Sequence, residues 1–214
     1  MTREPTAEFF DRYARDFNAI YGTANTPLNR VVNTFFRRSM RLRYEQVVAG
    51  CKPIIGRSVL DIGCGPGHYA VELAHRGASR VLGIDFADSM LEIARKAAAD
   101  KRVQNICAFQ HADFFRDTFD ERFDYVVVMG FMDYVEHPEP IVGKALGLAK
   151  SRAFFSFPLD GGVLAWQRKL RYKSRCNLFM YTEDQVQRIF SATTVARFDV
   201  STIDRDLFVT AYID

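Results

Sequence analysis

Five short apolar runs alternate with segments of helical periodicity between residues 58 and 158, and this alternation restricts the fold more than any other feature. The apolar runs predict strands at 58–63, 80–85, 106–113, 123–130 and 152–158. The segments with helical spacing predict helices at 68–77, 89–100 and 138–149. Because strands that alternate with helices form parallel sheets with right-handed crossovers, we expect an α/β fold with helices on both faces of one sheet.

The end of the chain follows a different pattern. The run "TEDQVQRIF" (182–190) predicts a helix with Thr182 as its N-cap and Gln185 completing a capping box. Two strand patterns follow, "TTVARFDVST" and "DLFVTAYID", joined by the short polar connection "IDRD". This connection is too short for a crossover helix, so we expect two antiparallel neighbours. A parallel sheet completed by such a hairpin differs from a plain dinucleotide-binding fold.

The length of 214 residues suits one domain, which we expect to span residues 1–214. Its sheet core would cover 56–158, and the last helix and hairpin 181–214. Two further segments lie outside the strand pattern: a helical region at 1–55 and an insertion at 159–180. We expect both to act as lids over the carboxyl edge of the sheet, where ligands bind in such folds.

Composition narrows the class of protein. No apolar run is long enough to span a bilayer, and the N-terminus "MTREPTAEFF" lacks the apolar core of a secretory signal. The isolated cysteines predict reduced thiols and a cytoplasmic protein; they are Cys51, Cys64, Cys107 and Cys176. No set of His, Asp or Glu has metal-ligand spacing, so we expect no metal site. The net charge of +3 does not indicate nucleic-acid binding.

The stretch "SVLDIGCGPGHYA" (58–70) places Gly63, Gly65 and Gly67 directly after a predicted buried strand. A strand, a glycine-rich turn and a helix N-terminus together present backbone N–H groups to a polar or anionic ligand. The dinucleotide fingerprint is G-x-G-x-x-G, whereas this loop reads G-x-G-x-G. The shorter spacing favours S-adenosylmethionine over a nicotinamide dinucleotide, and an NAD-dependent oxidoreductase is the alternative.

Acidic residues end the next two predicted strands. Asp85 ends the second strand, where a carboxylate accepts ribose hydroxyls in either class of ligand. Asp113 ends the third strand, where a carboxylate beside an adenine can accept from its amino group. The three motifs "LDIGCGPG", "GIDFADSMLEIAR" and "HADF" therefore predict a nucleoside-bearing ligand.

With these motifs the sequence resembles the class I S-adenosylmethionine-dependent methyltransferases over residues 56–157 and in its final hairpin. The resemblance implies a Rossmann-like sheet of seven strands, mostly parallel with an antiparallel last strand, and S-adenosylhomocysteine as product. It implies that the methionine part lies on Asp61, Gly63, Cys64, Gly65, Pro66 and Gly67. It assigns Asp85 to the ribose, and Phe86 and Met90 to the adenine. Asp113 would bind the adenine amine beside Phe114, and Tyr69 and Met129 complete the implied cofactor contacts.

Two segments before the glycine loop resemble smaller families. "RLRYEQV" is similar to the region preceding this loop in ubiquinone-biosynthesis O-methyltransferases, which implies that Arg41 pairs with the methionine carboxylate. "FFDRYARDFNAIYG" is similar to the N-terminal lid of small-molecule methyltransferases, which implies that Tyr13 and Tyr21 face the cofactor. The order of the segments is also similar, more weakly, to magnesium-protoporphyrin O-methyltransferases.

Methyl transfer from a sulfonium is an in-line displacement, so the protein mainly aligns the acceptor and excludes water. The segment after the fourth strand, "VMGFMDYVEHPEP", resembles a family pattern of leucine, acid, histidine and valine. On that pattern Asp133 matches the acid and Tyr134 replaces the histidine. A phenol is a poor base unless its pKa is lowered. His137 is the alternative base, although a histidine before Pro138 also reads as a solvated turn residue.

The run "WQRKLRYKSR" (166–175) is the most basic stretch of the chain. It reads either as a lid that contacts an acidic or phosphorylated acceptor, or as a solvated helix face. An RNA or protein methyltransferase would use this run together with Arg37, Arg38, Arg41 and Arg43, but no N-P-P-Y motif follows the fourth strand. We therefore expect a small-molecule acceptor and O-methylation in preference to N-methylation. The sequence defines neither the acceptor nor the oligomeric state.

Overall fold

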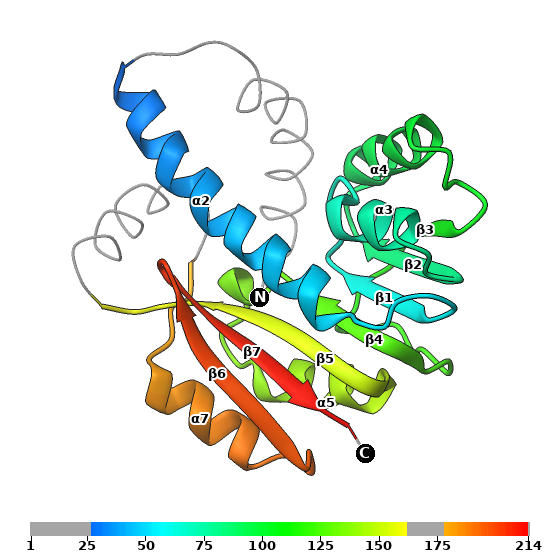
Figure 1. Ribbon diagram of the computed structural model, residues 1–214. Helices are drawn as coiled ribbons and strands as arrows, with labels where there is room; N and C mark the ends of the chain where they lie inside the picture. The colour runs from blue at the N-terminus through cyan, green and yellow to red at the C-terminus, as the bar shows by residue number, and fades with distance from the viewer. Residues whose placement is uncertain (1–26, 162–177, 214) are drawn as a thin grey trace.

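The protein is described by a computed structural model over residues 27–161 and 178–213, with side chains from residue 38 onward. Within these residues, seven strands form one sheet in the order β3-β2-β1-β4-β5-β7-β6 (Figure 1). The strands are β1 (Ser58–Ile62), β2 (Arg80–Asp85), β3 (Cys107–His111), β4 (Phe123–Val128), β5 (Ala149–Pro158), β6 (Arg197–Ile203) and β7 (Asp206–Tyr212). The pairs among β1 to β5 are parallel, whereas β7 is antiparallel to both of its neighbours, β5 and β6.

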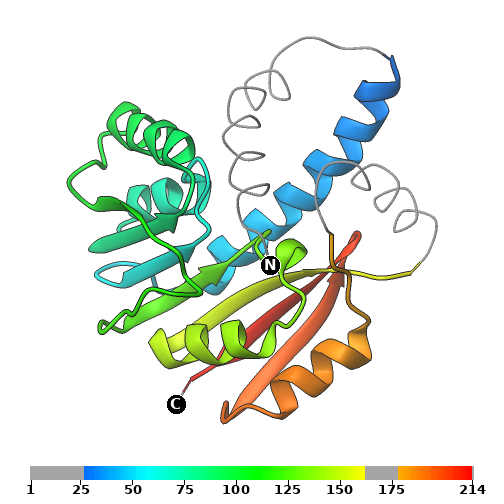
Figure 2. The same ribbon diagram turned by 180° about the vertical axis from the view of Figure 1, so that it is seen from behind.

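Helices cover both faces of this sheet (Figures 1 and 2). They are α2 (Pro27–Gly50), α3 (His68–His75), α4 (Asp88–Asp100), a 3-10 turn η1 (Met132–Tyr134), α5 (Glu139–Leu148) and α7 (Glu183–Ser191). One core contains side chains of α2 and α3, and a second core contains side chains of α5 and α7. The predicted α/β fold with a terminal antiparallel hairpin is therefore confirmed.

Successive side chains of the central strands alternate between these two cores. In β4, Val126 and Val128 pack toward α5 and α7, whereas Tyr125 and Val127 pack toward α2 and α3. All four are buried, as expected for a parallel strand covered on both faces. The predicted capping box of α7 is present, because Thr182 accepts from the backbone of Gln185 and the Gln185 side chain accepts from Thr182.

Three strands begin or end at other residues than the sequence predicts. β3 ends at His111 instead of 113, and the Asp113 backbone N–H donates to the Asp117 side chain. β4 ends at Val128 instead of 130, because Gly130 adopts a φ of 68° and turns the chain. β5 begins three residues early, at Ala149, where it pairs with Phe123.

The sheet order places the carboxyl ends of β2, β1 and β4 side by side. The chain leaves β1 toward β2 on one side, and β4 lies on the other, so the strand order reverses between β1 and β4. Ligands of open α/β sheets bind in the crevice at such a reversal. Helix α2 contacts α3 at this region and also the strands β6 and β7 (Figure 2).

Candidate active site

The glycine loop joins β1 to α3, and its glycines serve different purposes. Gly63 has a φ of 65°, and a Cβ on it would lie 2.7 Å from the ring of Phe131. Gly65 has a φ of 50°, and a Cβ there would meet nothing within 4 Å. Gly63 thus permits close approach of an aromatic ring, whereas Gly65 presents bare backbone to open space, as a ligand cradle requires.

The rest of the loop is held by packing. A Cβ on Gly67 would lie 2.9 Å from the Ala94 Cβ, so this glycine allows α3 to begin against α4. Cys64 is 5% exposed, and its Sγ lies 3.0 Å from the position of a Cβ on Gly83. Burial raises the pKa of the Cys64 thiol, so this cysteine fills space and is not a reactive thiolate. Pro66 is half-buried between these contacts.

Two carboxyl groups lie beneath the loop. Asp85 accepts the backbone N–H of Gly65 at 2.8 Å and that of Ala87 at 2.9 Å. Asp61 is 1% exposed, and among the described residues its Oδ2 has no hydrogen-bond partner. Burial and the nearby Asp85 carboxylate raise the pKa of Asp61 to about 7, against a hydrogen bond from the Ala70 backbone. Burial also raises the pKa of Asp85. A positively charged group bound nearby would favour the ionised form of both carboxyls.

Apolar and polar groups follow β2. Met90 is 3% exposed and forms a small cluster with Ala87, against which Phe86 packs. Phe86 itself is half-buried. The structure therefore brings Phe86 and Met90 together beside Asp85, where they form an apolar wall; their packing on the adenine stays a prediction.

The segment after β3 differs from its expected arrangement. Asp113 accepts the backbone N–H of Phe115 at 3.0 Å and lies 3.7 Å from Arg116 Nε. Phe114 is 3% exposed and packs in the core edge-on against Phe131, whereas Phe115 is 48% exposed and stacks on Phe131 at 5.7 Å. Residues 114–116 form a turn, and both rings contact Phe131 from it. Phe115 is the exposed one.

Residues 59–149 match a protein family described as "Methyltransferase domain". A ubiquinone biosynthesis O-methyltransferase of Neisseria meningitidis serogroup C is 37% identical over 122 residues, covering 55% of this chain and 49% of that protein. One of Shewanella halifaxensis is 31% identical over 118 residues, with the same two coverages. The chain thus spans about half the length of these relatives. The crystal structure of magnesium protoporphyrin IX methyltransferase from Synechocystis PCC 6803 with bound SAH superimposes with a TM-score of 0.78 at 20% identity, covering 98% of each chain.

By fold and core sequence the chain is similar to class I S-adenosylmethionine-dependent methyltransferases. This similarity agrees with the resemblance seen in the three sequence motifs, and these matches do not support the NAD-dependent alternative. The buried, unsatisfied Asp61 oxygen and the open backbone at Gly65 both fit a cofactor that carries a sulfonium and an ammonium group.

Of the two arginines before the glycine loop, Arg43 faces the sheet, whereas Arg41, which is expected to pair with the methionine carboxylate, faces solvent. Arg41 is 72% exposed and pairs with Glu45 at 3.3 Å. Arg43 is only 12% exposed, with its Nη1 3.3 Å from Ser156 Oγ. Two residues along an α-helix turn a side chain by about 200°, so the two arginines point in nearly opposite directions. The helical spacing of Ser39, Arg43 and Val47 indicates this face, because Ser39 and Val47 are both fully buried.

The predicted catalytic segment occupies the turn η1. Asp133 is 6% exposed, and its carbonyl accepts the backbone N–H of Phe179 at 2.9 Å. Tyr134 is half-buried, whereas His137 is exposed. Sequence reasoning missed Tyr181, whose hydroxyl donates to the carbonyl of Val135. Burial and the nearby Asp133 carboxylate raise the pKa of Tyr181, so this phenol stays protonated as a hydrogen-bond donor that fixes the turn.

The remaining expected residues divide between described and undescribed parts of the chain. Tyr69 is half-buried with its ring 6.1 Å from that of Tyr44, and Met129 is buried in the core beneath α2 and α3. Tyr13, Tyr21 and the basic run 166–175 lie outside the described residues. Within residues 27–161 and 178–213, no cluster of metal-binding side chains was found, nor a helix that could cross a membrane.

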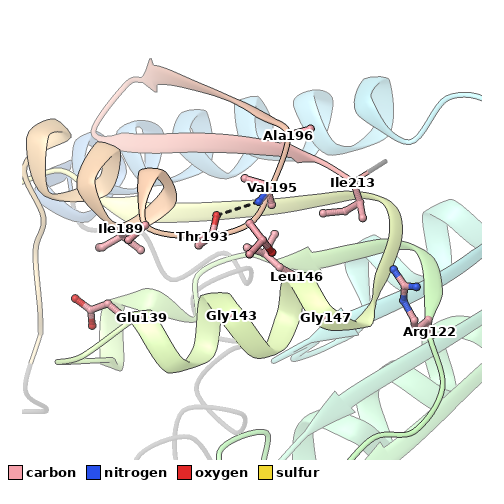
Figure 3. Close-up of a pocket in the computed structure, with 12 residues that line it drawn as sticks. Arg122, Glu139, Gly143, Leu146, Gly147, Ile189, Thr193, Val195, Ala196 and Ile213 are labelled. Carbon is pink, nitrogen blue, oxygen red and sulfur yellow. Dashed lines mark hydrogen bonds between the residues drawn. The ribbon is translucent and has the colours of Figure 1, made fainter.

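A pocket of about 580 Å³ is lined by none of the residues of the glycine loop. It lies between α5 and the connection that follows α7, with the small residues Gly143 and Gly147 on its helical side (Figure 3). Arg122 and Glu139 line opposite ends of it, and Leu146 is among its apolar residues (Figure 3). None of the residues predicted to bind the cofactor or the acceptor lines this pocket.

Proposed function

We propose that the protein transfers a methyl group from S-adenosylmethionine to a hydroxyl group of a small-molecule acceptor. The observation that carries this proposal is the pair of buried carboxyls, Asp61 and Asp85, beneath the open backbone at Gly65. The match of residues 59–149 to the methyltransferase family supports the reaction class. The names of the relatives support oxygen as the acceptor atom.

We assign the remaining cofactor contacts to residues near these groups. Asp85 would bind the ribose hydroxyls while retaining its place below Gly65. Phe86 and Met90 would pack on one face of the adenine. Asp113 would bind its amino group, and we assign the neighbouring aromatic contact to Phe115 because Phe114 is buried in the core.

The methionine part would lie between the loop and α2. Asp61 is positioned to attract the ammonium group, because its buried carboxyl gains most from a positive neighbour. We assign the methionine carboxylate to Arg43 in place of Arg41. A guanidinium binds a carboxylate through two parallel hydrogen bonds, which fixes orientation as well as charge.

S-adenosylmethionine supplies an activated methyl group, so the protein has to align the acceptor and exclude water. Alignment of this kind is worth on the order of 7–11 kcal/mol of the barrier. Tyr134 follows β4 and is half-buried, and we assign its hydroxyl the role of holding the acceptor hydroxyl in line. Asp133 and Tyr181 hold the turn that carries it. His137, exposed at the end of this segment, fits a solvated turn residue, and the acceptor proton would leave to solvent.

The proposed acceptor class follows from charge. The basic run 166–175 supports an acidic or phosphorylated small molecule, because cationic side chains attract anionic molecules. A reducing compartment is supported by Cys51, Cys64 and Cys107, which are buried free thiols.

The first test is isothermal titration with S-adenosylmethionine, S-adenosylhomocysteine and NAD⁺. We expect binding of the first two and none of the third. The matched variants are Gly65→Asn and Gly56→Asn: both glycines have positive φ and open space around a Cβ, and asparagine tolerates that backbone. Gly65→Asn should weaken cofactor binding at least tenfold, and Gly56→Asn should not. An unmodified protein that binds neither cofactor form would refute the proposal.

The second test separates oxygen from nitrogen as acceptor atom. Transfer of a labelled methyl group is measured to paired acceptors that differ only in a hydroxyl or an amino group. We expect transfer to the hydroxyl member of a pair. Transfer confined to amines, to RNA or to protein would replace the small-molecule O-methylation proposal.

A further inference from the structure

A chain of buried polar contacts joins α2 to the ends of three strands. Asp206, the first residue of β7, accepts a hydrogen bond from Ser39 Oγ and lies 3.5 Å from Arg43 Nε. Arg43 Nη1 lies 3.3 Å from Ser156 Oγ of β5, and this hydroxyl accepts the backbone N–H of Gly130 at 2.8 Å. The contacts thus run from the last strand through α2 to the residue that turns the chain after β4.

These groups are shielded from water. Ser39 and Ser156 are each 1% exposed, and the side chains of Arg43 and Asp206 are 12% and 3% exposed. A buried ion pair is weak support for stability, because its desolvation offsets much of its attraction. Hydrophobic side chains could hold α2 on the hairpin equally well. The pair therefore calls for a reason beyond attachment of the helix.

The position of the guanidinium supplies that reason. A Cβ on Gly130 would lie 3.5 Å from Arg43 Nη1, so the arginine lies directly beside the backbone that leaves β4. The next residue, Phe131, contacts Gly63 of the glycine loop. Arg43 therefore lies beside Gly130, one residue before the phenylalanine that contacts the glycine loop. This is the edge of the sheet where the strand order reverses.

We propose that Asp206 is a positioning residue, which holds Arg43 so that its guanidinium binds the carboxylate of the methionine part of S-adenosylmethionine. This inference rests on the proposed function. A guanidinium carries five N–H groups in one plane, so one edge can face Asp206 and Ser156 while another faces a ligand carboxylate. Ser156 joins the same arginine to Gly130, which couples cofactor binding to the turn that carries Tyr134.

The test compares two ligands that differ in the group concerned. S-adenosylhomocysteine carries the amino-acid carboxylate, whereas 5′-methylthioadenosine keeps the adenine, ribose and sulfur without the amino-acid part. Asp206→Asn preserves the shape of the side chain and removes its charge. We expect its affinity for S-adenosylhomocysteine to fall about 10- to 100-fold, as for loss of a charged hydrogen bond, with that for 5′-methylthioadenosine changed less than twofold.

A matched control comes from the same hairpin. Asp199 of β6 is 59% exposed and pairs with Arg197, so Asp199→Asn should change the affinity for neither ligand. Should Asp206→Asn fail to fold, Ser39→Ala removes one contact to Asp206 and should give a smaller loss with the same ligand selectivity. In turnover, either variant should raise KM for S-adenosylmethionine more than it lowers kcat.

The outcomes separate the two proposals. Equal loss of affinity for both ligands would mean that Asp206 supports only the fold, and unchanged affinity for S-adenosylhomocysteine would mean that Arg43 is not held for it. Either result overturns the inference. Failure of the unmodified protein to bind S-adenosylhomocysteine would instead refute the proposed function itself.

Discussion

The backbone N–H of Gly65 lies 2.8 Å from Asp85 Oδ2 and donates to it, so one carboxylate joins the glycine loop to the end of β2. The other oxygen of Asp85 accepts from Ala87, at the start of α4. One side chain therefore fixes the loop over which the methionine part would lie and the turn that precedes the adenine wall.

Replacing Asp85 with alanine should affect both binding and stability. The variant loses two hydrogen bonds to backbone N–H groups, each worth about 1 kcal/mol, together with the proposed ribose acceptor. We expect affinity for S-adenosylhomocysteine and for 5′-methylthioadenosine to fall together by at least tenfold, measured by calorimetry. Asp88→Ala is the control, because that side chain is 72% exposed at the beginning of α4. Unchanged affinity in Asp85→Ala would contradict the assignment.

The raised pKa of Asp61 predicts pH-dependent binding. At pH 6 the carboxyl, with a pKa of about 7, is largely protonated, and a cationic ligand group would favour its ionised form. Binding should therefore release a proton at low pH, and affinity for S-adenosylhomocysteine should rise between pH 6 and 8. Titration in buffers of different ionisation enthalpy measures the released proton. Asp61→Asn should abolish this dependence; a variant that retains it would assign the proton elsewhere.

The same group predicts how the free protein responds to pH. An aspartate with a pKa near 3.8 in the unfolded chain and about 7 in the fold holds its proton better when folded. The free energy of unfolding should thus fall as pH rises from about 4 to 7, by an upper limit on the order of 4 kcal/mol. Urea unfolding at several pH values measures this slope, which should flatten in Asp61→Asn. Asp85 contributes in the same direction, because its pKa is also raised.

Much of the fold was predictable because it depends on local patterns. Apolar runs, helical spacing and a short connection between two strands specify the sheet and its hairpin without reference to distant residues. The capping box likewise involves two residues within four consecutive positions, Thr182 and Gln185. The cofactor loop was predictable for a related reason: its glycines are required by backbone geometry, which a local sequence expresses directly.

Side-chain direction was harder to predict. Arg41 and Arg43 both precede the loop, and the choice between them depends on which face of α2 meets β5 and β7. Phe114 and Phe115 pose the same problem. They are adjacent in sequence, but only the ring of Phe114 is buried in the core. Tyr181 contacts Val135 from 46 residues away, and nothing near either residue in sequence indicates that contact.

Gly63→Ala tests the close approach at the loop. The new methyl group would lie 2.7 Å from the Phe131 ring, on a backbone with a φ of 65°. We expect a loss of about 1–3 kcal/mol in unfolding free energy from overpacking and strain. Phe131→Leu removes the ring, so the double variant should recover the steric part. Strictly additive effects in this double-mutant cycle would show that the ring is not the cause.

Tyr134 and His137 have separable roles under the proposed mechanism. Tyr134→Phe should lower kcat by about tenfold or more with little change in cofactor affinity, because the acceptor loses its orienting hydroxyl. His137→Gln should change kcat less than threefold, as expected for an exposed turn residue. A larger loss in His137→Gln, with the acidic limb of the kcat profile removed, would identify the histidine as a general base instead.

The contact between Ser39 and Asp206 spans 167 positions in the chain. A ribosome must therefore complete the hairpin before α2 can take its final position and Arg43 can be aligned. The strands β1 to β4 can assemble earlier during synthesis, because their pairings lie closer together in sequence. Under the proposed role of Arg43, competence to bind the cofactor carboxylate would arise late in translation, and nascent chains arrested before residue 206 should bind 5′-methylthioadenosine in preference to S-adenosylhomocysteine.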